Sequence, residues 1–205
     1  MDGLIVTGTD TGIGKTVVAA MLTLGLGGVY YKPTQSGIED GADRDTVQHL
    51  TGLSNDRILA DGITLTHPLS PHRAAELDGV EIDINTLTPP QNDRPLIVEG
   101  AGGLMVPVTR ETLLIDLFAK WNLPVVLTAR TGLGTLNHTL LSLEALRTRK
   151  IPVLGVAFVG DDNPDNIHTI AHMGHVKILG RVPMLDTINA DVLNRVFAEN
   201  FGEML

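Results

Sequence analysis

The sequence contains no cysteine among its 205 residues. Disulfide bonds and cysteine-ligated metal sites are therefore excluded. The seven histidines are scattered, with no HExxH or comparable ligand spacing, so a zinc site is not expected either.

The chain is also poor in positive charge, with 15 Lys and Arg against 24 Asp and Glu and a formal net charge of −9. Nucleic-acid binding needs clustered basic residues, so we expect no nucleic-acid partner. No apolar run reaches the roughly 18 residues of a membrane span. The N-terminus shows no basic region followed by a long apolar one, so no signal peptide is predicted. These absences favour a soluble, cytoplasmic protein without a membrane partner.

What the chain does contain is an alternation of short apolar runs with longer segments of helical periodicity. Strands are predicted at 4–7, 29–32, 96–99, 124–129, 153–159 and 177–182. Helices are predicted at 15–26, 43–53, 113–121, 136–149, 167–172 and 190–200. Wholly apolar strands in such an alternation predict an α/β fold with three layers, a parallel sheet with helices on both faces. Segment 54–94 is less periodic and loop-rich, and without a linker or repeat we predict a single domain over 1–205.

Residues 8–16 read GTDTGIGKT and lie between the first predicted strand and the first predicted helix. The general phosphate-binding loop reads G-x-x-x-x-G-K-[ST], which places its first glycine at position 9. That position is Thr9, and the glycine comes one residue earlier, at Gly8. The strand before and the helix after are nevertheless the context that a phosphate-binding loop requires. The sequence therefore predicts the loop of a P-loop NTPase-type sheet, with an irregular beginning.

Each residue type at the end of this loop suits a triphosphate. Gly12 and Gly14 allow the backbone to approach a phosphate closely, and the helix N-terminus favours an anion. Lys15 supplies a cation to the outer phosphates, and the Thr16 hydroxyl can ligate Mg²⁺. The expected nucleotide contacts here are Gly12, Ile13, Gly14, Lys15, Thr16 and Val17.

Lys15 is one of only two lysines in the first hundred residues, and the other is Lys32 in YYKPTQSG. Ligands of parallel sheets bind beyond the carboxyl ends of the strands, so Lys15 and Lys32 can converge on one site. A lysine before proline at a strand end can also be an ordinary solvated residue, but its position beside the loop favours a functional role. Ser36 and Gly37 follow and can offer hydroxyl and backbone donors.

Two acidic positions can complete a magnesium site. Glu99 ends a predicted buried strand, where a Mg²⁺-supporting carboxylate would lie; the alternative is a buried glutamate satisfied by backbone donors. In GADRDT, either Asp43 or Asp45 begins a helix, where an N-cap role is the alternative. Helix phase favours Asp43, with Asp45 as its substitute. Expected nucleotide contacts next to these are Gly100, Ala101 and Gly102.

Taken together, the motifs resemble the dethiobiotin synthetase family along nearly the whole chain. They are GTDTGIGKT at 8–16, YKPTQSG at 31–37, the acidic helix start at 43–45, LSPH at 69–72, VEGAGG at 98–103 and LGTLNHT at 133–139. The GTDT-x-x-GKT form is typical of that family, and its extra residue accounts for the irregular spacing.

This resemblance implies a ligase reaction in biotin synthesis, with 7,8-diaminononanoate, CO2 and ATP or another nucleoside triphosphate. One amine takes up CO2 as a carbamate, the γ-phosphate activates it, and the second amine closes the ureido ring. Lys15 and Lys32 would then neutralise two anionic reactants. Catalytic roles are implied for Lys32, Lys15 and Thr11, carbamate contacts for Thr11 and Ser36, and Mg²⁺ ligation for Thr16, Asp43 and Glu99.

The resemblance also implies a homodimer with active sites at the interface. In the family, the stretch at 133–139 holds the far carboxylate of substrate bound to the neighbouring subunit, which makes Thr135, Leu136 and Asn137 candidate contacts in trans. Thr135 can alternatively be a purely structural N-cap of the following helix.

One departure from the family concerns the nucleobase. Some members carry an asparagine that reads adenine near the end of the strand matched by 153–159, where this chain has Val159 and Gly160. We therefore expect the base to lie against Val159, Gly160 and the turn Pro183-Met184-Leu185, with weak discrimination among nucleoside triphosphates.

Two other classes of P-loop protein are alternatives to this interpretation. Amide ligases of the cobyrinic acid type usually carry a fused glutaminase domain with a cysteine, and this chain has neither the length nor a cysteine. Partitioning or septum-placing ATPase switches carry a signature lysine in the loop, where this chain has Asp10.

Overall fold

The computed structural model describes residues 2–38 and 41–202. Its centre is a six-stranded parallel sheet in the order β2-β5-β1-β6-β7-β8. The strands are Val29–Tyr31 (β2), Leu96–Gly103 (β5), Gly3–Gly8 (β1), Val125–Arg130 (β6), Val153–Val159 (β7) and Ile178–Val182 (β8). The predicted α/β architecture with a parallel sheet is confirmed.

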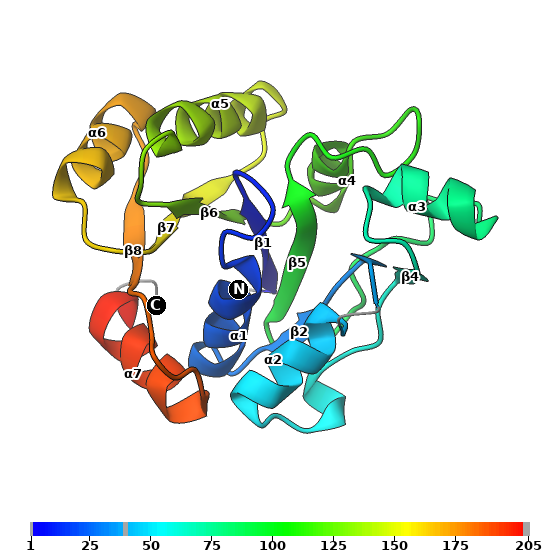
Figure 1. Ribbon diagram of the computed structural model, residues 1–205, viewed down its shortest axis with the longest axis horizontal. Helices are drawn as coiled ribbons and strands as arrows, with labels where there is room; N and C mark the ends of the chain where they lie inside the picture. Colours follow the sequence, from blue (N-terminus) through cyan, green and yellow to red (C-terminus); the bar gives the residue numbers. More distant parts are fainter. Residues whose placement is uncertain (1, 39–40, 203–205) are drawn as a thin grey trace.

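Helices cover both faces of this sheet (Figure 1). On one face lie Lys15–Gly25 (α1), Asp43–Thr51 (α2) and Ala190–Asn200 (α7), and on the other lie Leu114–Trp121 (α4), Thr135–Thr148 (α5) and Pro164–Gly174 (α6).

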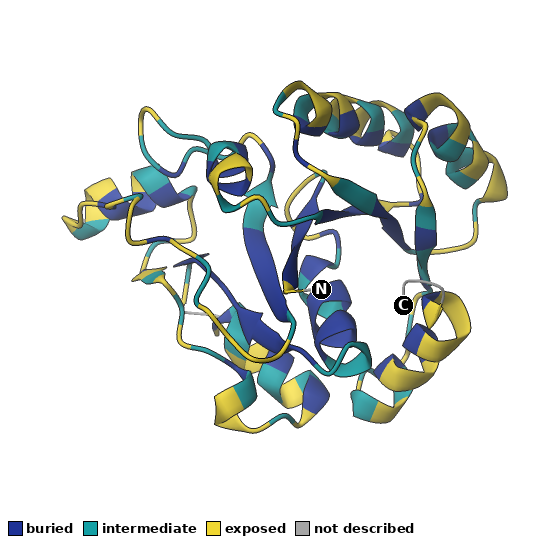
Figure 2. Cartoon of the chain, turned by 180° about the vertical axis from the view of Figure 1, so that it is seen from behind, coloured by how far each residue is buried: buried dark blue, intermediate teal, exposed yellow. Residues whose placement is uncertain are grey.

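Two apolar layers explain why the strands are largely apolar. Leu4 and Val6 belong to the core on the α1 side, whereas Ile5 belongs to the core beneath α4, because successive side chains of a strand point to opposite faces. Both faces are covered, so both sets must be apolar. Figure 2 shows the buried residues concentrated in the central strands and on the inner sides of the helices.

Segment 54–94 contains more regular structure than its composition indicates. It holds the 3₁₀ turn Asn55–Arg57 (η1), the strand Ile63–Leu65 (β4) and the helix Pro71–Asp78 (α3). Strand β4 pairs in parallel with Thr34–Ser36 (β3) in a separate two-stranded sheet. Strands of three residues are too short to display a period. Helix α3, by contrast, carries a proline in its first turn and a left-handed glycine after its end, which are ordinary helix signals.

Element boundaries agree with the sequence predictions at most ends, and the largest difference affects the site. Strand β5 continues to Gly103, so Glu99 lies within the strand and does not end it, contrary to the prediction. The continuation pairs Gly103 with Gly8 after a register shift. Helix α6 is also longer than the predicted 167–172.

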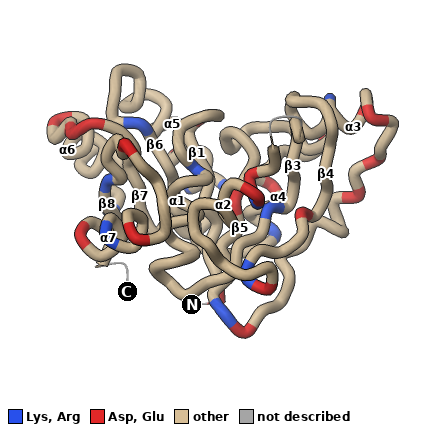
Figure 3. The backbone as a smooth tube through the Cα atoms, turned by 60° about the horizontal axis from the view of Figure 1, so that its bottom comes forward, with Lys and Arg blue, Asp and Glu red and all other residues tan. Residues whose placement is uncertain are grey.

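No helix within 2–38 and 41–202 is both long and apolar enough to cross a membrane. Figure 3 shows the positions of Lys and Arg dispersed along the backbone and interspersed with those of Asp and Glu.

Candidate active site

The loop between β1 and α1 has the backbone geometry of an anion cradle. Gly12 (φ 66°) and Gly14 (φ 93°) both adopt left-handed conformations, and Gly14 is the N-cap of α1. A Cβ on Gly14 would lie 2.9 Å from Cγ1 of Val159, so both conformation and space require glycine there. Because α1 begins at Lys15, its first-turn N–H groups and the positive end of its dipole lie at the end of the loop.

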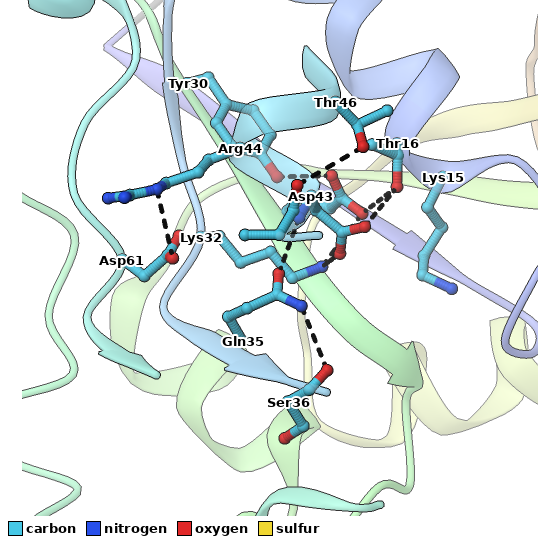
Figure 4. Close-up of polar contacts among 12 residues, drawn as sticks. Lys15, Thr16, Tyr30, Lys32, Gln35, Ser36, Asp43, Arg44, Thr46 and Asp61 are labelled. Atoms are coloured by element: carbon cyan, nitrogen blue, oxygen red, sulfur yellow. Dashed lines mark hydrogen bonds and ion pairs between the residues drawn. The ribbon is translucent and has the colours of Figure 1, made fainter. Parts of the chain in front are cut away.

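Lys15 is folded back into this loop. Its side chain is buried, and Nζ donates to the backbone carbonyl of Asp10 at 2.7 Å. Burial lowers the pKa of Lys15 to about 8; Glu99 opposes this shift, and the positive charge of Lys32 adds to it. In Figure 4 its ammonium group is turned away from the carboxylate of Asp43.

Lys32 is the buried centre of a second cluster. Nζ lies 3.2 Å from Oε1 of Glu99 and forms an ion pair with Asp43. Burial is the largest influence on the pKa of Lys32 and lowers it, but the negative charges of Glu99 and Asp43 outweigh burial and raise the pKa overall. The sheet explains the contact with Glu99: Tyr31 is paired with Val98, so the residue after each of them lies at the same level.

Thr16 joins this cluster to the phosphate loop. Its hydroxyl donates to Oε1 of Glu99 at 2.9 Å and lies 3.3 Å from Oδ1 of Asp43. A hydroxyl and two carboxylates are hard oxygen donors, which suit Mg²⁺. Three protein ligands leave room for phosphate oxygens and water, as Mg²⁺ prefers. The side chains present therefore fit the ion.

The structure distinguishes the two acidic residues at the start of α2. Asp43 faces Lys32 and Thr16, whereas Asp45 lies 3.6 Å from Nε of Arg44 and its side chain is 64% exposed. Neither residue is the N-cap, which is Ala42. Oε1 of Gln35 accepts from the backbone N–H of Asp43 at 3.1 Å and so fixes the start of the helix.

A cavity of about 430 Å³ opens on the β2 and β5 side of the phosphate loop. Thr11, Lys32, Ser36 and Asp43 line it, together with the segment 68–71. The Ser36 Oγ atom is buried and has no hydrogen-bond partner, so a ligand in this cavity would find an unsatisfied hydroxyl. Three of the residues predicted to contact substrate, Thr11, Lys32 and Ser36, are thus brought together here.

A second cavity, of about 560 Å³, opens on the β6, β7 and β8 side of the same loop. The predicted nucleoside contacts line it, namely Gly12, Ile13, Gly14, Val17, Val159, Gly160, Pro183, Met184 and Leu185. Its wall is mostly apolar, as a pocket for a flat base requires.

A larger cavity of about 690 Å³ lies near Asp2 and Trp121. It is lined by no lysine or arginine and lies at the amino ends of β1 and β5. Ligands of parallel sheets bind at the opposite ends of the strands, so we assign no part of the reaction to it.

Some predicted contacts lie elsewhere than expected. Ala101 and Gly102 line the cavity beside Lys32 and not the nucleoside cavity, while Gly100 is buried and lines neither. A Cβ on Gly100 would lie 2.9 Å from the ring of Phe118. Close packing therefore explains why this position is glycine.

The beginning of α5 also differs from one expectation. Gly134, not Thr135, is the N-cap. Thr135 is buried, and its hydroxyl donates to the carbonyl of Arg130 at 2.5 Å. Leu136 is half-buried and Asn137 exposed, and none of these three residues lines either of the two cavities beside the loop.

Three residues of the site were missed from the sequence. Tyr30 is fully buried and donates to Oε2 of Glu99 at 2.8 Å; its pKa is raised well above the usual value by burial and then by Glu99, so the hydroxyl keeps its proton. Arg130 donates to the carbonyl of Gly12 at 3.0 Å. Asp61 lies 3.8 Å from Arg44, and burial raises its pKa although Arg44 opposes the shift.

The sequence does contain features that point to two of these residues, Tyr30 and Arg130. Tyr30 lies two residues before Lys32 and so on the same face of its strand, and Arg130 ends a central strand beside the loop. Asp61 lies in the irregular segment, where no pattern points to it.

Comparison with known proteins agrees with this geometry. A model of the AAA domain family matches residues 2–192. An ATP-dependent dethiobiotin synthetase of Rhodopseudomonas palustris strain TIE-1 is 58% identical over 97% of this chain and 93% of its own length. The enzyme of the same name from Novosphingobium aromaticivorans is 55% identical over 98% and 97%.

Solved structures share the fold at much lower identity. A ParA family ATPase from Chlorobium tepidum superimposes with a TM-score of 0.58 at 11% identity over 97% of this chain and 96% of that one. The cell division ATPase MinD from Pyrococcus furiosus gives 0.56 at 12% identity over 97% and 98%. These structures support the fold alone, whereas the full-length identity above 50% identifies the relatives. The chain belongs to the dethiobiotin synthetase family.

Proposed function

We propose that this chain forms dethiobiotin from 7,8-diaminononanoate, CO2 and ATP, in biotin biosynthesis. The observation that carries the proposal is the cluster of Lys32, Asp43 and Glu99, in which Lys32 and Glu99 are buried. The cluster lies beside the phosphate loop and reaches a cavity separate from the nucleoside cavity. A ligase that joins two anionic reactants needs this arrangement, because each anion requires its own pocket and a shared cation between them.

The chemistry follows in three steps. An amine of the substrate adds to CO2 and loses a proton, giving a carbamate. A carbamate oxygen attacks the γ-phosphorus, and the bond between that phosphorus and the β-phosphate oxygen breaks. ADP departs, and the product is a carbamic–phosphoric anhydride. The second amine then attacks the carbamate carbon and loses a proton, and inorganic phosphate departs as the ring closes.

The chain's own residues bind and orient these groups. Lys15 and the N-terminus of α1 hold the outer phosphates, and Lys32 lies where the carbamate must meet the γ-phosphate. Their positive charges offset the charge of the transferring phosphoryl group. Thr11 and Ser36 line the same cavity as Lys32 and offer hydroxyls to the carbamate.

Thr16, Asp43 and Glu99 would hold Mg²⁺. When bound, the ion neutralises charge on the β- and γ-phosphates. Lys32 is shared by both carboxylates, so one positive charge faces two negative ones, and a cation bound here would offset the remaining negative charge.

We further propose a homodimer, with the first turn of α5 facing the partner's substrate. Leu133 is fully exposed at 109% and Leu141 and Met105 are also exposed, which supports an interface here. Because the Thr135 hydroxyl is engaged with Arg130, the carboxylate of the substrate would be met by backbone N–H groups and by Asn137. We also propose that the protein is cytoplasmic, because the reaction uses a nucleoside triphosphate and a small-molecule precursor.

The nucleoside cavity supports weak selection of the base. Val159 and Gly160 occupy the strand end, and the turn at 183–185 completes an apolar wall. Shape and backbone contacts alone discriminate poorly between bases. Turnover measured with ATP, CTP and GTP tests this; a strong preference for ATP alone would contradict it.

Substrate-dependent phosphate release, together with incorporation of labelled bicarbonate, tests the reaction itself. Lys32→Ala should lower kcat by about 100- to 1,000-fold, the range for removing one charge-stabilising donor. Lys120→Ala, which removes an exposed lysine from α4, is the matched control and should behave as the wild type. Normal turnover of Lys32→Ala would refute the role of Lys32.

The same assay separates the proposal from a partitioning-type switch. A switch would hydrolyse triphosphate without regard to diaminononanoate or CO2. Asp10 stands where such a switch carries its signature lysine, and its carbonyl accepts from Lys15. This argues against that function.

A further inference from the structure

Tyr30 combines a core position with a polar contact. It is fully buried in the apolar layer between the sheet and α1, where phenylalanine would fill the same space. A buried hydroxyl is unfavourable unless it is hydrogen-bonded. Among the described residues, the one hydrogen bond of this hydroxyl is its donation to Oε2 of Glu99 at 2.8 Å.

The two oxygens of the Glu99 carboxylate have different surroundings. Oε1 is contacted by the Thr16 hydroxyl at 2.9 Å and by Nζ of Lys32 at 3.2 Å, both of which belong to the reaction side. Oε2 is held from the core side by Tyr30. The terminal torsion of a glutamate is broad and easily turned, so contacts at both oxygens are what hold the carboxylate plane.

We infer that Tyr30 is a positioning residue for the metal–nucleotide complex: it fixes Oε2 of Glu99 so that Oε1 alone faces the phosphate loop. The inference rests on the proposed role of Glu99 as a metal ligand. Outer partners of this kind orient a ligating group, and their loss typically lowers metal affinity by about 10- to 100-fold. Tyr30 itself touches no reacting atom.

Tyr30→Phe removes only the hydroxyl, and Tyr31→Phe is its matched control. Tyr31 is also buried, but it packs in the core on the opposite face of the sheet. Mn²⁺ binding is measured in the presence of ADP through the electron paramagnetic resonance signal of free Mn²⁺. This measurement needs no diaminononanoate. We expect the Kd for Mn²⁺ to rise about 10- to 100-fold in Tyr30→Phe and to stay within about twofold of wild type in Tyr31→Phe.

Two further measurements exclude a merely structural effect. Binding of a fluorescent ADP without divalent metal should be unchanged in Tyr30→Phe, and thermal unfolding should show a folded protein. In a Glu99→Gln background, adding Tyr30→Phe should change Mn²⁺ affinity by less than about twofold, because coupled residues are not additive. Because phenylalanine fills the same space as the tyrosine ring, Tyr30→Phe is expected to fold.

The outcomes separate the two proposals. Unchanged Mn²⁺ affinity in Tyr30→Phe, or an equal loss in the Glu99→Gln background, overturns the role of Tyr30 whatever the enzyme's activity. A selective loss of Mn²⁺ affinity supports it even if the wild type fails to form dethiobiotin, a result that would refute the proposed function alone.

Discussion

The two cavities beside the phosphate loop differ in how they can recognise a ligand. The one next to β2 and β5 is lined by Lys32, Asp43 and the hydroxyl-bearing residues Thr11, Thr34, Ser36 and Ser70. The one next to β6, β7 and β8 offers mainly apolar walls and loop backbone, although Arg130, Thr131 and Asp161 also line it. A single buried charged side chain can contribute strongly to the binding of a ligand. An apolar wall contributes through many contacts, each of which is weak. Single substitutions should therefore have large effects on the first side and small ones on the second.

The largest effect should come from Lys15, which stands between the two sides. We expect Lys15→Met to lower kcat/KM for ATP by about 100- to 1,000-fold. Burial of its charge disfavours the charged form, as the lowered pKa indicates, so the unfolding midpoint without nucleotide should not fall. Steady-state kinetics and calorimetry check both parts. Loss of activity accompanied by a large drop in that midpoint would indicate a structural role instead.

Next comes a matched pair on α2. Asp43→Asn should lower activity at limiting Mg²⁺ about 100-fold, equivalent to about 2.7 kcal/mol, because Asp43 contacts Lys32 and Thr16. Asp45→Asn, on the exposed side of the same helix turn, should stay within about twofold. Activity titrated with Mg²⁺ distinguishes them. Equal losses in both variants would remove the distinction between the two carboxylates.

The smallest effects are expected in the nucleoside cavity, and one substitution should alter its character. Val159→Asn introduces an amide where the wall is apolar and should raise the ATP-to-CTP ratio of kcat/KM about 10-fold, about one hydrogen bond's worth. Met184→Ala, which trims a 70% exposed side chain of the same wall, should change all triphosphates alike by less than about threefold. A large, base-specific loss in Met184→Ala would contradict a wall of many small contacts.

The sheet and the loop were predictable from the sequence because local patterns specify them. Apolar strands alternating with amphipathic helices indicate a covered parallel sheet, and Gly14-Lys15-Thr16 after a strand indicates a phosphate cradle. Lys32 and Glu99 could be placed near this cradle, because carboxyl ends of parallel strands share one edge.

Other features depended on contacts between distant residues. The pairing of β3 with β4 joins two three-residue strands that carry too little periodicity to detect. Thr135 looked like a helix cap, yet its hydroxyl bonds Arg130 of the preceding strand. No local pattern could reveal that the Tyr30 hydroxyl reaches Glu99, a residue 69 positions away.

The place of β1 inside the sheet has a consequence for how such a protein can diverge. Because β1 separates β5 from β6, the residues lining the Lys32 cavity all come from 11–106 and most of those lining the nucleoside cavity from 130–188. Apart from the first turn of α5, which we propose to face the partner's substrate, preference for a nucleotide and preference for an acceptor are thus encoded in different stretches of the gene. Either can drift, or be exchanged between relatives, while the loop that both share stays the same.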